Sequence, residues 1–366
     1  MTDREPKNWR AKHVLITGFP ALLPGALARR ILNDTSKPTV YLFVDKSNKS
    51  TGQKFKSSFP RSQRSRLVLV EGRQDTVELG MSGAQVQSLT EKVDMIFHAN
   101  YYNPTSVRKG TSNLGNLRHL IRLSIACKSL RRLCLFSTTA VNRHPTDTVY
   151  EEELAKPKGD GTPSDTLRRA EQVIRELMPR LPCTVFRPST IVGDSQTGES
   201  EGLHDSLGRV LSSLIHSPSQ MPVLVPQARN MPFNVVPIDF VVSAAWTIAC
   251  HPASMSRTFH LTDPNPMRVE DAFALFSDLN NRQRPVFYGR LFAHAITLAR
   301  GSVFRRFIPD FLVEQARGVI ASRYDCAGTL DLLRETEIRC PQFETYADNL
   351  ATWLARVERD SLNVHH

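Results

Sequence analysis

The stretch His13-Val14-Leu15-Ile16-Thr17-Gly18-Phe19-Pro20-Ala21 decides the fold of this chain. The residues up to Thr17 form a short apolar run that is typical of a buried strand, and Gly18 marks the turn that follows. Apolar residues then recur at helical spacing from Leu22 to Asn33, which predicts a crossover helix. A buried strand, a glycine turn and an amphipathic helix are typical of the first unit of a parallel α/β sheet.

Further apolar runs repeat this strand pattern along the first half of the chain. They lie at residues 39–44, 66–71, 93–98, 132–137 and 183–187. Such nearly continuous apolar strands indicate that helices cover both faces of the sheet. We therefore expect an α/β protein with a Rossmann-like doubly wound parallel sheet. Ligands bind such sheets at the carboxyl ends of the strands, where Thr17-Gly18, Asp45, Asn100 and Thr138 would converge on one crevice.

The composition changes after the sheet. Residues 195–232 are rich in Ser, Gly and Pro, and they predict a flap over the crevice. The chain then returns to the core through Asn234-Val235-Val236-Pro237-Ile238-Asp239-Phe240-Val241-Val242. The segments that we expect are a polar tail 1–10, a Rossmann-like core 11–194, the flap 195–232, the return 233–264 and a smaller helical C-terminal lobe 265–366. Helices are expected in this lobe at 269–279, 292–307 and 346–357.

Charge and composition limit the classes of function. The 366 residues are 40% hydrophobic and 23% charged, which is ordinary for a globular protein with a large core. The net charge of +11 favours attraction to a protein partner or an acidic surface. Basic residues occur in short clusters without interleaved aromatic residues, so nucleic acid is disfavoured as a partner.

The cysteines and the N-terminus indicate the compartment. The six cysteines are widely separated and form no Cys-x-x-Cys pair, which suits reduced thiols and no metal site. The polar start of the chain does not resemble a signal peptide. No apolar run reaches about 18 residues, so we expect no membrane span. We expect a cytoplasmic protein, and a homo-oligomer is left open.

Several motifs are similar to those of a known family. They are Leu133-Cys134-Leu135-Phe136-Ser137-Thr138, Phe186-Arg187-Pro188-Ser189, Gly193-Asp194-Ser195-Gln196-Thr197-Gly198-Glu199 and Arg257-Thr258-Phe259-His260-Leu261. Together with the first strand they resemble an extended short-chain dehydrogenase/reductase, in the branch of thioester and fatty acyl-CoA reductases with a male-sterility-type NAD-binding domain. The resemblance implies a Rossmann fold, a substrate-side lobe and NADP or NAD as a cofactor.

The catalytic pair of that family is missing from this chain. The family uses a Tyr and a Lys four residues later, and the Lys lowers the Tyr pKa so that the phenol exchanges a proton with a carbonyl. None of the seven tyrosines is followed by a Lys at that spacing. Matching Ala170-Glu171 to the family's Ala-Glu places Pro163 and Leu167 at the two positions, and Thr138 at the retained hydroxyl. A replacement by Tyr150, Lys156 or Lys158 is left open.

The motifs for the dinucleotide are also altered. The family's Thr-Gly-x-x-Gly-x-x-Gly corresponds to Thr17-Gly18, with Ala21 and Pro24 at the later glycines, and Pro20 removes one backbone N–H. A weakened nucleotide site and a turn that binds nothing are both compatible with this pattern. Because an acidic residue, Asp45, and a basic one, Lys46, stand side by side here, the sequence does not decide between NAD and NADP. The residues that would contact a dinucleotide, if one binds, are Thr17, Gly18, Phe19, Ala21, Asp45, Lys46, Arg73, Ala99 and Arg187.

Two functions follow from this pattern of losses. Because the scaffold motifs remain while the nucleotide and catalytic motifs have changed, our first interpretation is a catalytically degenerate protein that acts as a scaffold, regulator or ligand sensor. The alternative is an NAD(P)H-dependent reductase of a carbonyl or acyl-thioester substrate with replaced catalytic residues. His98, at the end of a predicted strand, is interpreted as a buried polar residue without a partner that would make it a base.

Overall fold

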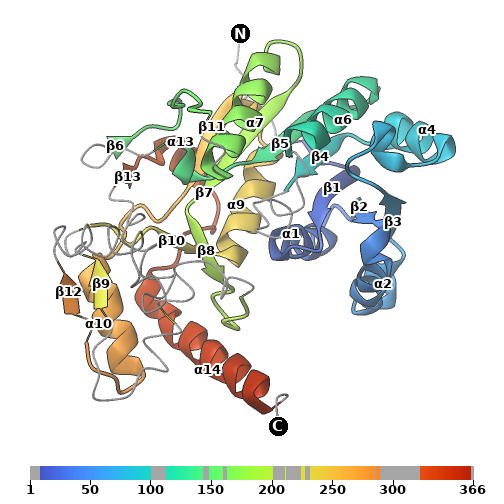
Figure 1. The fold of residues 1–366 in the computed structure, drawn as a ribbon. Coiled ribbons are helices and arrows are strands. Elements are labelled where there is room, and N and C mark those ends of the chain that lie inside the picture. The colour runs from blue at the N-terminus through green and yellow to red at the C-terminus, as the bar shows by residue number, and fades with distance from the viewer. Residues whose placement is uncertain are drawn as a thin grey trace, which may run out of the picture.

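A seven-stranded sheet forms the centre of the protein in the computed structural model (Figure 1), which describes residues 9–99, 113–142, 148–159, 163–200, 211, 224–226, 231–284, 286–288 and 322–363. Neighbouring strands are all parallel. Their order is β11 (Arg257–Leu261), β7 (Cys183–Pro188), β5 (Arg132–Phe136), β4 (Met95–His98), β1 (His13–Phe19), β2 (Thr39–Asp45) and β3 (Leu67–Gly72). The order reverses direction at the β1–β4 pair, which is where doubly wound sheets bind ligands.

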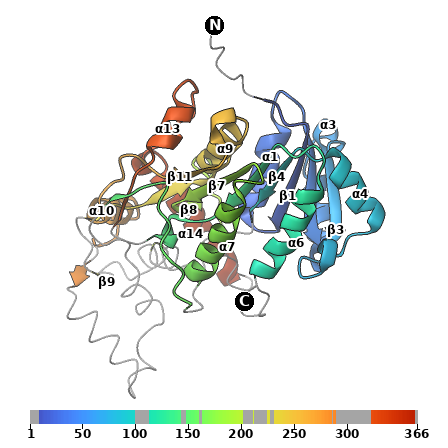
Figure 2. The same ribbon diagram turned by 90° about the horizontal axis from the view of Figure 1, so that it is seen from above.

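Helices cover both faces of the sheet (Figure 2). One face carries α1 (Leu22–Leu32), α2 (Lys49–Ser57) and α9 (Ile238–Ala249), and the other carries α4 (Gly83–Lys92), α6 (Asn113–Ala126) and α7 (Pro163–Leu177). The first face is held by a row of phenylalanines on adjacent strands. Phe97, Phe136, Phe186 and Phe259 are fully buried, with successive ring centroids 6.2, 5.4 and 6.2 Å apart. Such a row couples four strands through one apolar layer.

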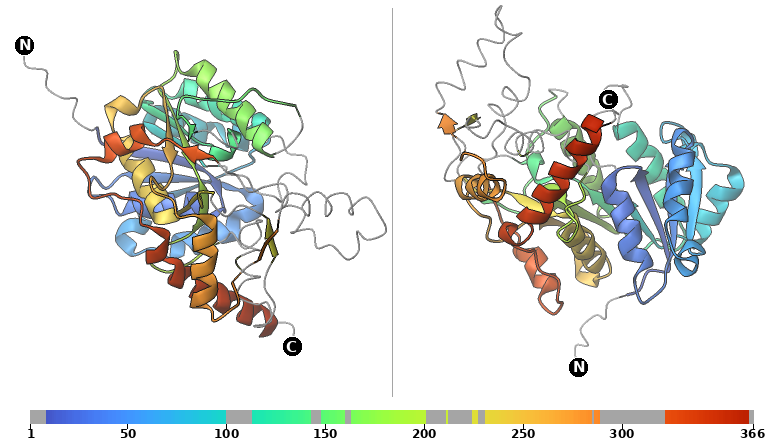
Figure 3. Two further views of the ribbon diagram at one scale, coloured as in Figure 1. Left: turned by 90° about the vertical axis from the view of Figure 1, so that its left-hand side faces the viewer. Right: turned by 90° about the horizontal axis from the view of Figure 1, so that it is seen from below.

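The C-terminal lobe has a core of its own. It contains α10 (Val269–Leu279) and α14 (Ala347–Asn363), with Phe233, Phe273 and Phe343 packed edge to face between them. Figure 3 shows these two helices on the same side of the sheet. Short parallel pairs complete the fold: β8 (Thr190–Gly193) with β10 (Val235–Pro237), β9 (Leu224–Pro226) with β12 (Val286–Tyr288), and β6 (Thr148–Val149) with β13 (Arg323–Tyr324), which precedes α13 (Ala327–Leu333).

Short helical turns connect the larger elements. They are η1 (Lys46–Asn48), α3 (Arg61–Arg64), η2 (Val77–Gly80), η3 (Thr139–Val141), η5 (Pro252–Ser254) and η7 (Phe343–Thr345). In η2, Glu78, Leu79 and Gly80 all have positive φ, between 53° and 62°. This left-handed turn places Leu79 in the core beside Phe43 and Val70. Burial of the Leu79 side chain offsets the backbone strain of its conformation.

The strands and the first crossover helix predicted from the sequence are confirmed to within two residues. The returning segment 234–242 contains only a short strand, β10, because α9 begins at Ile238. The predicted lobe helix at 269–279 is confirmed, the one predicted at 346–357 is present but continues to Asn363, and α13 was not predicted. The helix expected at 292–307, residues Asn100 to Tyr102 and most of the flap lie outside the described residues.

None of the helices in the described ranges combines the length and the apolar character that a membrane crossing requires. The cysteines in the described ranges are all free, and those at 127, 134, 183 and 326 are buried. Burial raises the pKa of the Cys127 thiol to about 11. A thiol with a raised pKa is protonated, and therefore unreactive, at neutral pH.

Candidate functional site

The turn after β1 retains the shape of a dinucleotide turn. Gly18 has a φ of +107°, a conformation that side chains with a Cβ rarely adopt, and its carbonyl accepts from Ala21 N at 3.3 Å. Ala21 is the N-cap of α1 and supplies no side-chain cap, and the first turn of α1 holds no acidic residue. Nothing of negative charge in this first turn competes with an anion for the positive end of the helix.

The same turn has fewer backbone N–H donors than the family pattern provides. A helix N-terminus binds phosphate through the backbone N–H groups of its first turn. Pro20 in the turn and Pro24 in the first turn of α1 have no N–H to offer. The side chain of Phe19 points away from the turn into the core, where its ring lies 5.1 Å from that of Phe55. The pyrophosphate end of a dinucleotide therefore fits this turn with fewer hydrogen bonds than the family pattern provides.

His98 and Thr17 form a buried pair at the end of β4 and β1. Thr17 Oγ1 lies 2.7 Å from His98 Nδ1, so His98 has the partner that sequence reasoning did not find. Both side chains are at most 8% exposed. Burial lowers the pKa of His98 to about 4, so the ring is neutral at physiological pH. This supports a structural role for His98 beneath the turn rather than that of a base.

At the ends of β2 and β3 the predicted cofactor residues engage in local contacts. Asp45 caps η1, and its Oδ1 accepts from Ser47 N at 3.0 Å and Ser47 Oγ at 2.7 Å. Lys46 is exposed. The Arg73 guanidinium lies 3.4 Å from Asp75 Oδ2, and both side chains face solvent. Asp45 and Lys46 therefore belong to the start of a surface loop, with local contacts that do not depend on a cofactor.

The hydroxyls at the end of β5 remain close to the switch point. Thr138 is buried and caps η3 by accepting from Ala140 N at 3.2 Å. The Ser137 hydroxyl is fully buried and has no hydrogen-bond partner among the described residues. Ala99 is fully buried and donates its N–H to Thr17 O. A buried hydroxyl without a partner is a usual sign of a site that a ligand group or a water completes.

Helix α7 carries the positions of the missing catalytic pair. The helix begins at Pro163, as the proline predicts. Leu167 lies one turn further and is 7% exposed. Arg168 Nε donates to Val141 O at 2.9 Å, which fixes this turn of α7 against η3 and so near Thr138. A leucine at this place provides neither the charge that activates a phenol nor a donor to a ribose.

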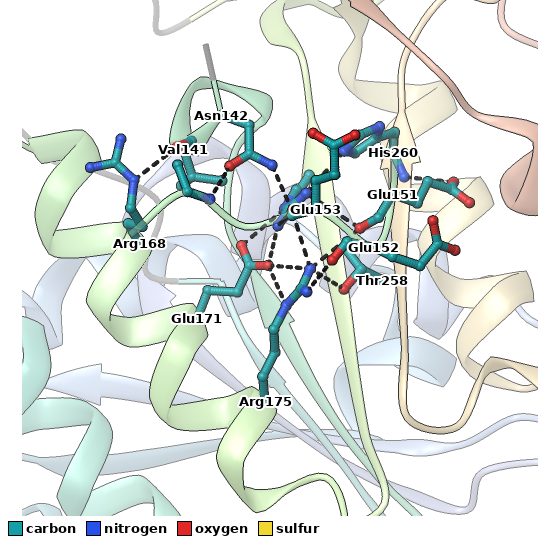
Figure 4. A network of polar contacts seen from close by, with 12 residues as sticks. Val141, Asn142, Glu151, Glu152, Glu153, Arg168, Glu171, Arg175, Thr258 and His260 are labelled. Atoms are coloured by element: carbon teal, nitrogen blue, oxygen red, sulfur yellow. Dashed lines mark hydrogen bonds and ion pairs between the residues drawn. The ribbon is translucent and has the colours of Figure 1, made fainter. Parts of the chain in front are cut away.

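Arg187 is a structural residue, in contrast to the expectation that it contacts a cofactor. It is fully buried on β7, and its Nε donates to Glu171 Oε2 at 3.0 Å. Arg175 on α7 also donates to Glu171, at 3.0 Å, and to carbonyls of the segment 151–153. Figure 4 shows Glu171 and Arg175 facing this segment from α7. The network thus joins α7, β7 and the chain before α7, and it leaves Arg187 no free donor face.

Glu151 is a second buried carboxylate behind this network (Figure 4). Its side chain accepts from His260 N at 2.9 Å, Gly328 N at 3.1 Å and Thr329 Oγ1 at 3.2 Å. Burial raises the pKa of Glu151 to about 7. Burial and the neighbouring Arg187 lower the pKa of His260 to about 3, so its Nε2 is free to accept from Arg187. Glu151 ties β6 to β11 and α13.

The other proposed replacements for the catalytic pair are exposed or engaged elsewhere. Tyr150 is 53% exposed, next to the buried Glu151. Lys156 and Lys158 are exposed, and the backbone N–H of Lys158 donates to Asp165 on α7, which holds this loop on the helix. Asp194, in the motif Gly193–Glu199, forms a turn by accepting from Gln196 N and Thr197 N, both at 2.9 Å. In the described part of the chain no group of His, Cys, Asp and Glu has the arrangement of a metal site.

Comparisons with known proteins give the family. The chain matches the family of male sterility proteins, an NAD-binding domain family, over residues 16–245. It is 28% identical to the nonribosomal peptide synthetase FrzA of a Cladobotryum species over 61% of this chain, and 25% identical to the glycine betaine reductase ATRR of Emericella nidulans over 94% of it. The chain spans only 23% and 29% of those two relatives.

The fold has a close structural counterpart. The terminal R domain of the myxalamid biosynthetic pathway aligns with a TM-score of 0.75 and 21% identity, over 98% of this chain and 93% of that domain. This likeness concerns the fold. The chain therefore belongs to the male sterility, or thioester-reductase, branch of the extended short-chain dehydrogenases/reductases.

Proposed function

We propose that this chain is a thioester-reductase-type domain that has lost hydride chemistry and acts as a non-catalytic scaffold or ligand sensor. The observation that carries the proposal is Leu167, a buried aliphatic residue where the family places its ammonium. Pro163 at the Tyr position has no proton to donate, so the family's general acid is absent there. General acid–base catalysis contributes about 10²–10⁴-fold to a rate, so the loss of both groups removes the usual route.

The pyrophosphate and nicotinamide ends of the altered site differ in their fit to a dinucleotide. Gly18 and the N-terminus of α1 offer the adenosine and pyrophosphate end a positive helix end without a competing acid. At the nicotinamide end, Leu167 replaces the Lys that holds the ribose in the family. A bound NADP or NAD would be held mainly at its pyrophosphate. This favours weak binding without turnover, which is what a sensor requires, over a productive hydride geometry.

A reductase with replaced catalytic groups is the second candidate. The comparisons favour it, because the relatives that match include proteins named as reductases. Thr138 is retained at the end of β5, and the unpartnered Ser137 hydroxyl lies beside it. These hydroxyls would polarise a substrate carbonyl, but a proton donor other than the family's Tyr would be required.

One experiment separates the two candidates. The purified protein is titrated with NADPH and NADH, followed by nicotinamide fluorescence and thermal shift, and then assayed with an aldehyde and an acyl thioester. We expect at most a thermal shift, since a ligand that binds only the folded state raises the melting temperature by mass action. NADPH oxidation that depends on the acyl substrate, and that the matched variant Thr138→Val abolishes while Thr139→Val does not, would establish the reductase instead.

A further inference from the structure

The positive charge of this chain is concentrated in one connection of the sheet. The chain holds 47 Lys and Arg against 36 Asp and Glu, and residues 46–66 hold seven of the basic residues and none of the acidic ones. This segment contains η1, α2 and α3 and connects β2 to β3. Most of the net charge of +11 therefore lies in about one-seventeenth of the chain.

Four of these cations, together with Arg29 of the neighbouring helix α1, form a group that we name the α2–α3 basic surface. It consists of Arg29 of α1 with Lys54, Lys56, Arg61 and Arg64. The Arg29 guanidinium lies 4.9 Å from the ring centroids of both Phe55 and Phe59 and donates to Ser58 Oγ at 3.2 Å. Arg64 donates to Ser57 O at 2.7 Å and Phe59 O at 2.9 Å.

The surface lies at the amino edge of the sheet. A chain that leaves the carboxyl end of β2 must return to the amino edge before the parallel strand β3 begins. Arg66, at the end of this return, donates to Pro38 O ahead of β2 and to Leu32 O at the end of α1. The α2–α3 basic surface therefore lies at the opposite edge of the sheet from Gly18, Asp45 and Thr138. Its charge is not part of the predicted dinucleotide site.

Hydrogen bonds within the protein explain the presence of only some of these basic residues. Arg64 and Arg66 satisfy carbonyls at the ends of α2 and α1, where a cation is favoured. Within the described ranges, no Asp or Glu forms an ion pair with any member of the α2–α3 basic surface. Close like charges without acidic neighbours repel one another in the free protein, and a partner of opposite charge relieves that repulsion.

We propose that the α2–α3 basic surface docks an acidic segment of a protein, rich in Asp and Glu. A membrane is disfavoured as the occupant because Phe55 and Phe59, the large apolar side chains here, pack on each other and beneath Arg29. No aromatic ring remains for base stacking, so single-stranded nucleic acid is disfavoured too. The proposal does not depend on whether the domain is catalytic.

The test measures binding of a fluorescein-labelled Asp/Glu-rich peptide by anisotropy at low salt. The triple variant K54E/K56E/R61E should bind at least about tenfold more weakly, and K54Q/K56Q/R61Q should show a smaller loss. The control K92E/K128E/R180E makes the same change in net charge at exposed sites elsewhere, and it should stay within about twofold of the parent. In the presence of peptide, Lys54 and Lys56 should also be protected from acetylation relative to Lys92 and Lys128.

Two further binding measurements distinguish an acidic protein segment from nucleic acid and from a membrane. Duplex DNA of the same net charge and vesicles of phosphatidylcholine with phosphatidylserine are measured with the same variants. Tighter binding of either one than of the peptide, or equal losses in the K54E/K56E/R61E and K92E/K128E/R180E proteins, would overturn the proposal. The NADPH titration of the parent and of K54E/K56E/R61E should coincide, so failure here is distinguishable from failure of the proposed function. Unchanged melting temperatures verify folding, and the Gln variant serves if the Glu variant does not fold.

Discussion

Replacement of Glu151 by Gln tests whether a buried carboxyl links the fold to pH. Burial raises the pKa of Glu151 to about 7 from 4.5, and nearby Asp325 acts in the same direction. His260, which contacts Glu151 through its backbone N–H, is neutral, and Arg187 reaches only the Glu151 carbonyl. Among the described residues no cation forms an ion pair with the Glu151 carboxylate, although Arg257 Nη2 lies in the same neighbourhood, beside Gly328. At about 1.4 kcal/mol per pKa unit, the shift corresponds to about 3 kcal/mol.

The sign follows from linkage. Because the folded pKa of Glu151 lies above the unfolded one, its stabilising contribution is complete below about pH 4.5 and is lost as pH rises through about 7. We expect the free energy of unfolding of the parent, measured by urea denaturation, to fall by about 3 kcal/mol relative to Glu151→Gln between these limits. The glutamine keeps an acceptor for His260 N and Thr329 Oγ1, but its NH2 group faces Gly328 N.

Comparison of parent and variant at each pH isolates this one group. Titration of other residues, including the buried histidines, contributes to both proteins and cancels in the difference. Glu152→Gln, the adjacent residue in the same segment, is the control and should keep the pH dependence of the parent. A difference between parent and Glu151→Gln that does not change from pH 4.5 to pH 8 would refute the reasoning.

Other substitutions test the remaining buried groups. Arg187→Met leaves Glu171 with a reduced set of donors and should lower the free energy of unfolding by about 3–5 kcal/mol, measured in urea. Gly328→Ala places a Cβ 2.2 Å from Glu151 Oε2 and should cost about 1–3 kcal/mol by thermal unfolding, relieved in part by Glu151→Ser. Because the folded pKa of His98 is lowered to about 4, its contribution is present above pH 6.5 and lost as pH falls, so His98→Asn should flatten acid unfolding in that range.

The fold was predictable because its signals are local. Strands buried on both faces appear as apolar runs, and α1 shows helical spacing directly after Gly18. Helix α9 was harder to assign, because it is apolar on most sides: it packs on the sheet between α1 and α13, with buried residues such as Val241, Ala245 and Trp246. An apolar stretch of that kind has no polar face from which a helical period could be inferred.

The buried network was not predictable from the sequence for a different reason. Its members lie far apart in the chain, and their pairing depends on tertiary contacts between α7, β7 and the segment 151–153. One signal was available, because Arg187 stands inside an otherwise apolar strand, and a buried arginine requires an acid. The family resemblance instead suggested a cofactor contact there. Asp45 and Lys46 were also expected to contact a cofactor, and the structure places them at the start of a surface loop, where Asp45 caps η1.

Helix α7 keeps the residues of the buried ion-pair network but lacks the Tyr and Lys of the catalytic pair, and the stability of the fold explains this difference. Glu171 is one turn beyond Leu167 on α7, fully buried, and bound to Arg187 and Arg175. Loss of Glu171 would leave the buried Arg187 without its acid, and breaking a buried ion pair in this way costs several kcal/mol whatever the function of the protein. Replacement of the Tyr and Lys of the catalytic pair carries no comparable penalty, since an aliphatic residue at position 167 is buried favourably. Stability therefore preserves the network on this helix, while only catalysis could have preserved the pair.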